Sequence, residues 1–95
     1  MNTDSRRLDA ALRALADRNR RAILELVRER PRAVGDIAGH FSITQQAVSH
    51  HLGVLESAGL VSGHREGTRH LFTADAGGLD VIRDYLGRDW PPRGG

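Results

Sequence analysis

Residues 43–59 read ITQQAVSHHLGVLESAG, and this stretch decides the fold expected for the chain. It has apolar side chains spaced four and three residues apart, at positions 48, 52 and 55, which predicts a helix with one buried side. The opposite side carries short or planar hydrogen-bonding groups in its first turns: Gln45, Gln46, Ser49 and His50. A helix of this kind is suited to placing its N-terminal end in the major groove of DNA.

The residues before this helix complete a helix-turn-helix pattern. Apolar residues at helical spacing predict a short helix over residues 34–40. Thr44 is a suitable N-cap for the next helix, over residues 45–58, and Gly59 suits its C′ position. Because the connection between the two helices is tight, we expect a helix-turn-helix over residues 34–58.

Two further helices are predicted nearer the N-terminus, over residues 5–16 and 18–30, and Pro31 ends the second. The polar side of the second helix is rich in arginine. For Arg20 and Arg21 we weigh contact with DNA phosphates against an ordinary solvated face, in which arginines pair with glutamates of the same helix.

A two-stranded hairpin is predicted over residues 60–73, because two apolar residues, a polar stretch, the turn residue Gly67 and an alternating segment follow one another. We call this hairpin the wing. Arg65, Thr68 and Arg69 lie near its tip, where they could follow the sugar-phosphate backbone or enter the minor groove. The alternative is that these residues are polar only because an exposed hairpin must be.

The last predicted helix, over residues 76–90, carries one continuous apolar stripe, and the first helix carries a narrower one. Large apolar groups on terminal helices indicate packing of the two ends on each other and on a second subunit. Packing within one subunit is the alternative. A chain of 95 residues removes only about two-thirds of its unfolded surface from water, so a monomer would be marginally stable, which favours a dimer. The residues assigned to the dimer interface are Leu8, Leu12, Leu15, Leu79, Ile82, Leu86 and Trp90.

The composition indicates a single domain over residues 1–95, with a disordered tail at residues 91–95. The net charge of +2 is too small to indicate nucleic-acid binding by itself. With no cysteine there is no disulfide and no thiolate metal site. No segment approaches the roughly 20 apolar residues of a membrane span, and there is no apolar signal core, so we expect a cytoplasmic protein.

No pattern typical of an enzyme is present, so we expect neither a catalytic site nor a cofactor. His64 and His70 would form a weak zinc site if they faced each other across the hairpin, although ordinary polar roles are favoured. Because histidine gains charge on mild acidification, we expect DNA affinity at constant salt to rise between about pH 8 and about pH 6.

Four segments resemble, in order and spacing, the arsenical-resistance repressor (ArsR/SmtB) family of bacterial winged-helix regulators. They are LADRNRRAILELVRERP, VGDIA, TQQAVSHHLGVLESAGLV and REGTRHLFTAD. The part AVSHHLGVLESAGLV is the most specific, because AGLV directly precedes the hairpin. The resemblance covers residues 15–86, nearly the whole chain.

This resemblance implies a mainly α, winged helix-turn-helix fold with about five helices and a two-stranded wing. It also implies a homodimeric repressor on a pseudo-palindromic operator in double-stranded DNA, with the fourth helix in the major groove. The matching DNA-contacting positions are Thr44, Gln45, Gln46, Ser49, His50, Arg65, Thr68 and Arg69.

The sequence departs from the family pattern in three ways. Gly53 stands where a basic residue is common, which removes a phosphate contact, and Gln46 stands where proline is common, which adds an amide able to read adenine. The cysteine, or histidine and carboxylate, ligands of the metal-sensing members are absent. We therefore expect no metal, and release by an unidentified small molecule, a protein or the protein's own concentration. The alternative function is a protein-interaction module on the same scaffold.

Overall fold

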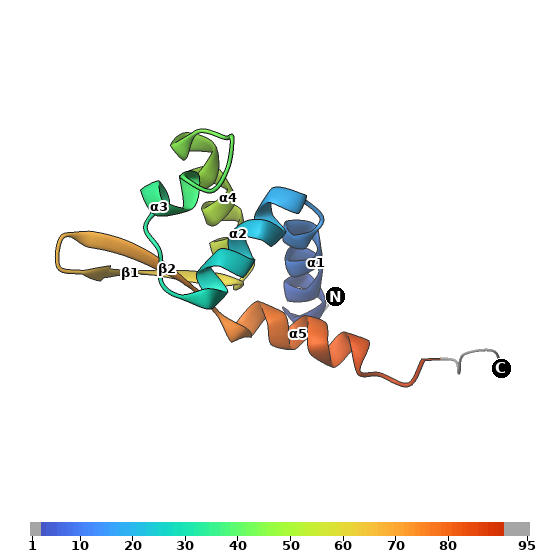
Figure 1. Cartoon of the computed structure of the whole chain (residues 1–95). Helices are drawn as coiled ribbons and strands as arrows, with labels where there is room; N and C mark the ends of the chain where they lie inside the picture. Colours follow the sequence, from blue (N-terminus) through green and yellow to red (C-terminus); the bar gives the residue numbers. More distant parts are fainter. Residues whose placement is uncertain (1–2, 91–95) are drawn as a thin grey trace.

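The structure, a computed structural model, describes residues 3–90, and the tail expected to be disordered, residues 91–95, lies outside them. Five helices and one hairpin gather around a single core, with the hairpin projecting from one side and α5 running along the other (Figure 1). In chain order the elements are α1 (Thr3–Leu15), α2 (Arg18–Glu29), α3 (Val34–Ala38), α4 (Gln45–Ser57), β1 (Val61–Glu66), β2 (Arg69–Ala74) and α5 (Ala76–Leu86).

The core lies where α2, α3 and α4 meet the base of the hairpin. The predicted buried side of α4 is confirmed, since Val48, Leu52 and Leu55 are at most 1% exposed. Ile23 of α2 and Ile37 of α3 pack against them and are fully buried. Burying such side chains stabilises the fold by about 1.5–3 kcal/mol each.

Both ends of α4 are closed as the sequence predicts. The Thr44 hydroxyl accepts a hydrogen bond from the Ala47 amide at 3.0 Å, which satisfies one of the free amides of the first turn. Gly59 adopts a φ of +73°, a conformation that favours glycine. The Leu60 amide then donates to the Leu55 carbonyl at 2.9 Å, as in a Schellman motif. These caps hold both ends of the helix on which the proposed reading residues stand.

The first four helices begin and end within two residues of the predicted positions, and the last helix begins where predicted, but its predicted end is wrong. Its predicted end was residue 90, whereas α5 ends at Leu86 with Gly87 as its C-cap. Glycine favours termination because it has a low helix propensity. Trp90 lies beyond the helix, where its indole nitrogen donates to the Leu86 carbonyl at 3.0 Å and its ring packs edge-on against Tyr85.

The wing is closed by a two-residue turn, and this turn determines which residues face each other. Gly67 has a φ of +65° and Thr68 follows it, the pattern of a type II′ turn. In the resulting antiparallel register Arg65 is opposite His70, and Glu66 is opposite Arg69. Because opposed residues share a face, Arg65 and Arg69 lie on opposite faces of the wing.

Arg32, a residue that the sequence analysis did not single out, ties the wing to the helices. Its backbone pairs with Phe72 of β2 through two hydrogen bonds of 3.0 and 2.8 Å. Its side chain is only 5% exposed; Nε donates to the Leu26 carbonyl of α2 at 2.8 Å, and Nη1 donates to Asp36 of α3 at 3.1 Å. Arg32 therefore fixes the base of the wing relative to α2 and α3.

The start of α5 is seated directly on the end of α4. Asp75 caps α5 by accepting from the Gly77 amide at 2.9 Å. The Gly78 amide donates to the Gly59 carbonyl at 2.8 Å, and a Cβ at position 78 would lie 2.5 Å from the Ala58 carbonyl oxygen. This close approach is available only to glycine, so the joint between the two helices depends on it.

Candidate nucleic-acid interface

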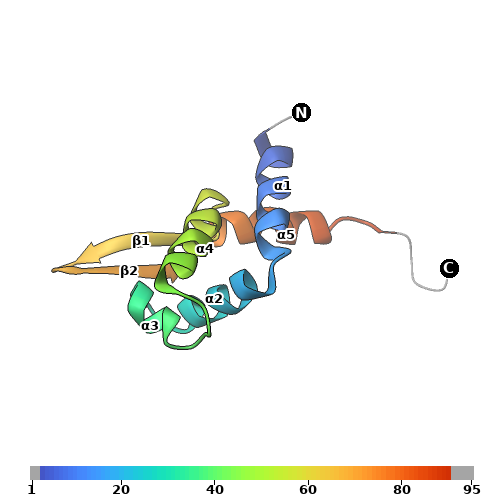
Figure 2. The same ribbon diagram turned by 90° about the horizontal axis from the view of Figure 1, so that it is seen from above.

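The exposed side of α4 forms the centre of the candidate interface. Viewed from above, α4 lies between the wing on one side and α1 on the other (Figure 2). The predicted reading residues cluster on the first two turns of α4 and all are exposed to solvent: Thr44, Gln45, Gln46, Ser49 and His50. The structure therefore brings these five side chains together on one accessible surface.

The N-terminal end of α4 also offers backbone groups to an anion. The first amides of a helix lack partners within it and carry partial positive charge. Here the Thr44 hydroxyl satisfies the Ala47 amide, and the Thr44 carbonyl accepts from the Val48 amide at 3.0 Å. The amides of Gln45 and Gln46 at the tip point outward along the helix axis, an arrangement that favours a phosphate oxygen.

The cations of the wing are accessible, but they do not form one patch. Arg65, Thr68 and Arg69 are all exposed. Arg65 shares its face with His70, whose ring packs against Phe72 with the centroids 4.7 Å apart. Arg69 lies on the other face, opposite Glu66. The two arginines can therefore approach a nucleic acid from different sides of the hairpin.

The zinc site considered for His64 and His70 is excluded by the register. His64 is opposite Leu71, and His70 is opposite Arg65, so the two imidazoles project from opposite faces. The physical reason is the two-residue turn, which sets this register. His64 and His70 would be opposite each other only if the register were shifted by one residue. Across residues 3–90, no group of three or more histidine, aspartate or glutamate side chains could hold a metal ion.

The exposed position predicted for Arg20 is wrong. Its side chain is 17% exposed and folds back over the C-terminal end of α1. Nε donates to the Ala14 carbonyl at 2.7 Å and Nη2 to the Arg13 carbonyl at 3.3 Å, while Nη1 lies 3.4 Å from Nδ1 of His51. A cation at a helix C-terminus is stabilised by the free carbonyls, and this attraction holds the guanidinium away from solvent.

Arg21 is exposed, as predicted, but it too contacts the end of α1. Its Nη1 donates to the Leu15 carbonyl at 2.7 Å. Asp17 completes this corner as the N-cap of α2, and the backbone amide of Arg20, which donates to its carboxylate, lowers the Asp17 pKa below its usual range. The corner between α1 and α2 is thus held by Asp17, Arg20 and Arg21, and the bonds of the two arginines to α1 carbonyls were not predicted from the sequence.

The residues expected at a dimer interface separate into two groups. Leu15, Leu79 and Ile82 pack against the core of the same chain, and Leu8 is half-buried. The remaining three are the exposed large hydrophobic residues of the described chain: Leu12 (44%), Leu86 (63%) and Trp90 (50%).

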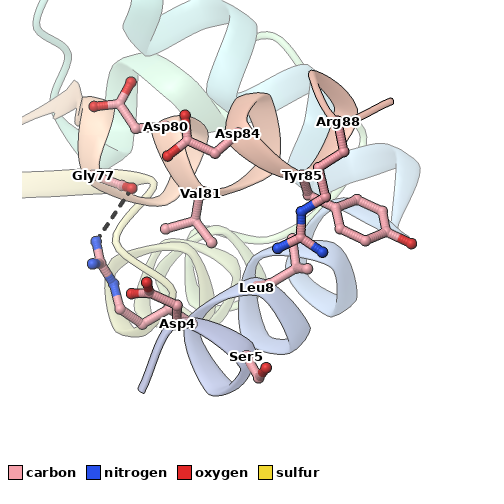
Figure 3. Close-up of a pocket in the computed structure, with 10 residues that line it drawn as sticks. Asp4, Ser5, Leu8, Gly77, Asp80, Val81, Asp84, Tyr85 and Arg88 are labelled. Atoms are coloured by element: carbon pink, nitrogen blue, oxygen red, sulfur yellow. Dashed lines mark hydrogen bonds between the residues drawn. The ribbon is translucent and has the colours of Figure 1, made fainter. Parts of the chain in front are cut away.

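A groove runs between α1 and α5 beside these residues. Leu8 and Val81 line its middle, and Tyr85 and Arg88 lie at one end, with the Arg88 guanidinium 5.2 Å from the centre of the Tyr85 ring (Figure 3). At the other end, Nη2 of Arg7 donates to the Gly77 carbonyl at 3.3 Å.

Over the residues that the structure covers, no helix is both long and apolar enough to cross a membrane.

Comparison with known proteins finds bacterial transcriptional regulators. The chain is 44% identical over 82 residues to the HTH-type transcriptional regulator Rv2034 of Mycobacterium tuberculosis, covering 86% of this chain and 77% of that protein. It is 40% identical over 60 residues to the transcriptional repressor SdpR of Bacillus subtilis, covering 63% of this chain and 67% of that protein.

A solved structure shows the same architecture. It is the homodimeric winged helix-turn-helix DNA-binding domain of a possible ArsR-family regulator from Mycobacterium bovis, with a TM-score of 0.70, 36% identity and coverage of 84% of this chain and 72% of that one. The predicted winged helix-turn-helix fold is confirmed, and residues 17–62 match the model of the bacterial regulatory proteins of the arsR family. With its helix-turn-helix and wing in place, this chain belongs to the arsR family and is a DNA-binding transcriptional regulator, not an enzyme.

Proposed function

We propose that the protein is a repressor that binds a pseudo-palindromic operator as a homodimer, with one α4 in each of two successive major grooves. The observation that carries this proposal is the exposed polar cluster at the N-terminal end of α4, which offers amide, hydroxyl and imidazole groups without a competing salt bridge within residues 3–90. Such groups discriminate bases through hydrogen bonds to their major-groove edges.

Within this surface we assign different roles to α4 and the wing. Gln45, Gln46 and Ser49 contact base edges, with Gln46 able to pair bidentately with adenine, and His50 contacts a base or a phosphate. Arg65, Thr68 and Arg69 contact the sugar-phosphate backbone or the minor groove beside it. Arg21 remains a candidate phosphate contact, whereas Arg20 contributes positive potential, because its donors already bind the end of α1.

Two features support a homodimer. Leu12, Leu86 and Trp90 expose large apolar surfaces along α1 and the end of α5, and such a concentration of apolar surface marks a protein interface. The related domain of Mycobacterium bovis is homodimeric. A two-fold dimer also matches a pseudo-palindromic operator, because its symmetry places two identical reading helices on two half-sites.

The signal that releases the operator is proposed to be something other than a metal ion: a small molecule, a partner protein or dilution of the repressor itself. The supporting observations are the lack of cysteine in the whole chain and of a three-ligand cluster within residues 3–90. The site of action is proposed to be the bacterial cytoplasm, because operator DNA lies there.

The test uses the DNA upstream of the protein's own gene, because such regulators commonly control adjacent transcription units. Affinity is measured by fluorescence anisotropy on this duplex and on a shuffled duplex of the same length over a range of salt concentrations. Gln46→Ala and Ser49→Ala should each lose about 1–3 kcal/mol on the specific duplex and little on the shuffled one.

The wing variants should behave differently. Arg65→Ala and Arg69→Ala should weaken binding to both duplexes alike and reduce the salt dependence by about one phosphate contact per subunit. Equal losses on both duplexes for all four variants would contradict this division of roles. If the unaltered protein bound the upstream and shuffled duplexes equally well, the proposal that it represses through this upstream operator would be contradicted.

A further inference from the structure

The reading helix has no cation of its own to meet the phosphates that flank the groove it enters. Between Gln45 and Ser57, α4 contains neither lysine nor arginine, and its one formal charge is that of Glu56. Two nearby arginines of α2, Arg20 and Arg21, direct donors to the carbonyls of α1. With Arg20 engaged and Arg21 partly engaged, a further cation for this part of the interface would come from another element.

A shallow hollow beside α4 shows which element it is. The hollow lies between the C-terminal half of α1 and the exposed side of α4, and it is lined on the α4 side by His50 and Gly53. On the α1 side it is lined by Arg13, and Arg20 of α2 also lines it. No carboxylate among the described residues lines it, so a net positive surface adjoins the reading residues.

Arg13 is the cation of this hollow that is available for a ligand. Its side chain is exposed, and within residues 3–90 its guanidinium makes no hydrogen bond or ion pair. Only its backbone carbonyl is engaged, by Arg20. Arg13 lies in the last turn of α1 and lines the hollow together with residues of α4, and Figure 2 shows α1 next to α4.

Gly53 keeps the approach to Arg13 open. A Cβ at this position would meet no atom within 4 Å, so there is open space directly above the helix at Gly53. A phosphodiester passing over α4 can therefore come close to the helix at this point. The long side chain of Arg13 can reach toward it from the neighbouring helix without displacing a packed group.

We propose that Arg13 is a DNA-phosphate ligand, which binds the backbone of the strand on the α1 side of α4 while the wing binds the backbone on the other side. The inference rests on the proposed function and adds a contact from α1 to it. Arginine suits this role because its planar guanidinium donates two parallel hydrogen bonds to a phosphate. With Arg13 and the wing on its two flanks, α4 is held in register by contacts that carry no sequence information.

The test compares Arg13→Gln with the unaltered protein on the upstream and shuffled duplexes. Arg13→Gln should weaken binding to both by the same factor, about 3- to 10-fold at moderate salt, and should reduce the slope of log affinity against log salt by about one for each subunit bound. Arg13→Lys should retain the slope, because the charge remains, and should lose less affinity.

Arg6→Gln is the matched control. Arg6 lies seven residues earlier on the same side of α1, about 10 Å along the helix, and lines an adjoining hollow with Glu56 at the C-terminal end of α4. Its replacement removes the same charge from the same helix face but should leave the salt slope unchanged. Circular dichroism and thermal unfolding of both variants check that the fold is retained.

A second variant tests the geometry by moving the cation. Gly53→Arg places a guanidinium on α4 in open space, so in the Arg13→Gln background it should restore most of the lost affinity and salt slope. An unchanged slope in Arg13→Gln, while the unaltered protein still prefers the upstream duplex, would overturn this inference and leave the proposed function standing. Absence of DNA binding by the unaltered protein would overturn both.

Discussion

The Arg32 guanidinium joins α2 to α3, while its backbone pairs with β2 of the wing. It is buried, and besides the α2 carbonyl it binds Glu29 at 2.9 Å and Asp36 at 3.1 Å. His40 lies at the edge of this cluster, with Nε2 3.4 Å from Nη1 of Arg32. Because a buried cation without partners is costly, the carboxylates are needed to hold the guanidinium in place. The orientation of the wing therefore depends on ion pairs formed some distance from the DNA.

This cluster predicts a contribution to acid sensitivity. The side-chain hydrogen bond from Arg32 is the main cause that lowers the pKa of Asp36 below its ordinary value of 3.8, with further attraction from Arg32 and Arg30. The folded state thus binds this proton more weakly than the unfolded state does. The stability contributed by Asp36 is present above about pH 4 and is lost as the pH falls through the lowered pKa.

Asp36→Asn should accordingly reduce the free energy of unfolding near neutral pH and flatten its decline between about pH 5 and about pH 2. Urea unfolding at a series of pH values measures this slope. Asp9→Asn serves as the control, because Asp9 is an exposed carboxylate of α1 without a hydrogen bond or ion pair in residues 3–90. If the free energy of unfolding of Asp36→Asn declined with falling pH as steeply as that of the unaltered protein, the Arg32–Asp36 pair would contribute nothing to acid sensitivity. Part of the decline should remain in both proteins, because the pKa of Asp17 is also lowered.

At the scale of elements, the joint between α4 and α5 makes a second prediction. A Cβ at position 78 would meet the Ala58 and Gly59 carbonyl oxygens at 2.5 and 3.0 Å, and these backbone atoms cannot move aside easily. Gly78→Ala should therefore cost about 1–3 kcal/mol of stability, because the start of α5 must shift away from the end of α4.

Gly53→Ala is the opposite case and the matched control. Gly53 also lies in a helix, but a Cβ there meets nothing within 4 Å, so the change should raise stability by about 0.4–1 kcal/mol. Both variants are compared by urea unfolding at one fixed protein concentration, since dimerisation makes stability depend on concentration. If Gly78→Ala were as stable as Gly53→Ala, the close approach seen in the structure would not exist in solution.

The sequence predicted most of the fold because its signals were local. The apolar spacing of α4, the Thr44 cap and the left-handed Gly59 each involve residues within one or two helical turns. The end of α5 was missed because a stripe of apolar spacing continues past Gly87 to Trp90, although the tryptophan packs back on the helix end.

The candidate site could be predicted only where it is formed by exposed residues of one element. The cluster on α4 follows from periodicity alone. Arg20 could not be placed, because a long side chain can turn either to solvent or to carbonyls of another helix, and the sequence does not show which carbonyls are near. The faces of Arg65 and Arg69 depend on the length of the turn, because a register shift of one residue would place both arginines on the same face.

At the scale of the whole molecule, the exposed apolar residues at the ends of the chain predict how two subunits meet. Leu86 is 63% exposed although its helix packs on α1, so a large part of it is available to a second copy. Leu86→Asp should weaken dimerisation by at least about tenfold, because it places a charge on each subunit where the proposed interface would bury apolar surface.

Sedimentation equilibrium at micromolar concentration measures this shift toward the monomer. Thr68→Asp adds the same charge at the tip of the wing, far from α5, and should leave the mass unchanged while it weakens DNA binding. If both variants stayed dimeric, or if both became monomeric, an interface formed by the ends of α1 and α5 would be contradicted.

The register of the wing, which puts Arg65 and Arg69 on opposite faces, also bears on the width of the DNA minor groove that the wing can bind. A hairpin with an arginine on each face can touch the two backbones of a minor groove at the same time, one with Arg65 and the other with Arg69. Such a two-sided grip is tighter when the groove is narrow, and narrow minor grooves occur in A·T-rich DNA. In the proposed complex, the outer flanks of the operator would then be selected by their shape, at base pairs that no side chain reads directly.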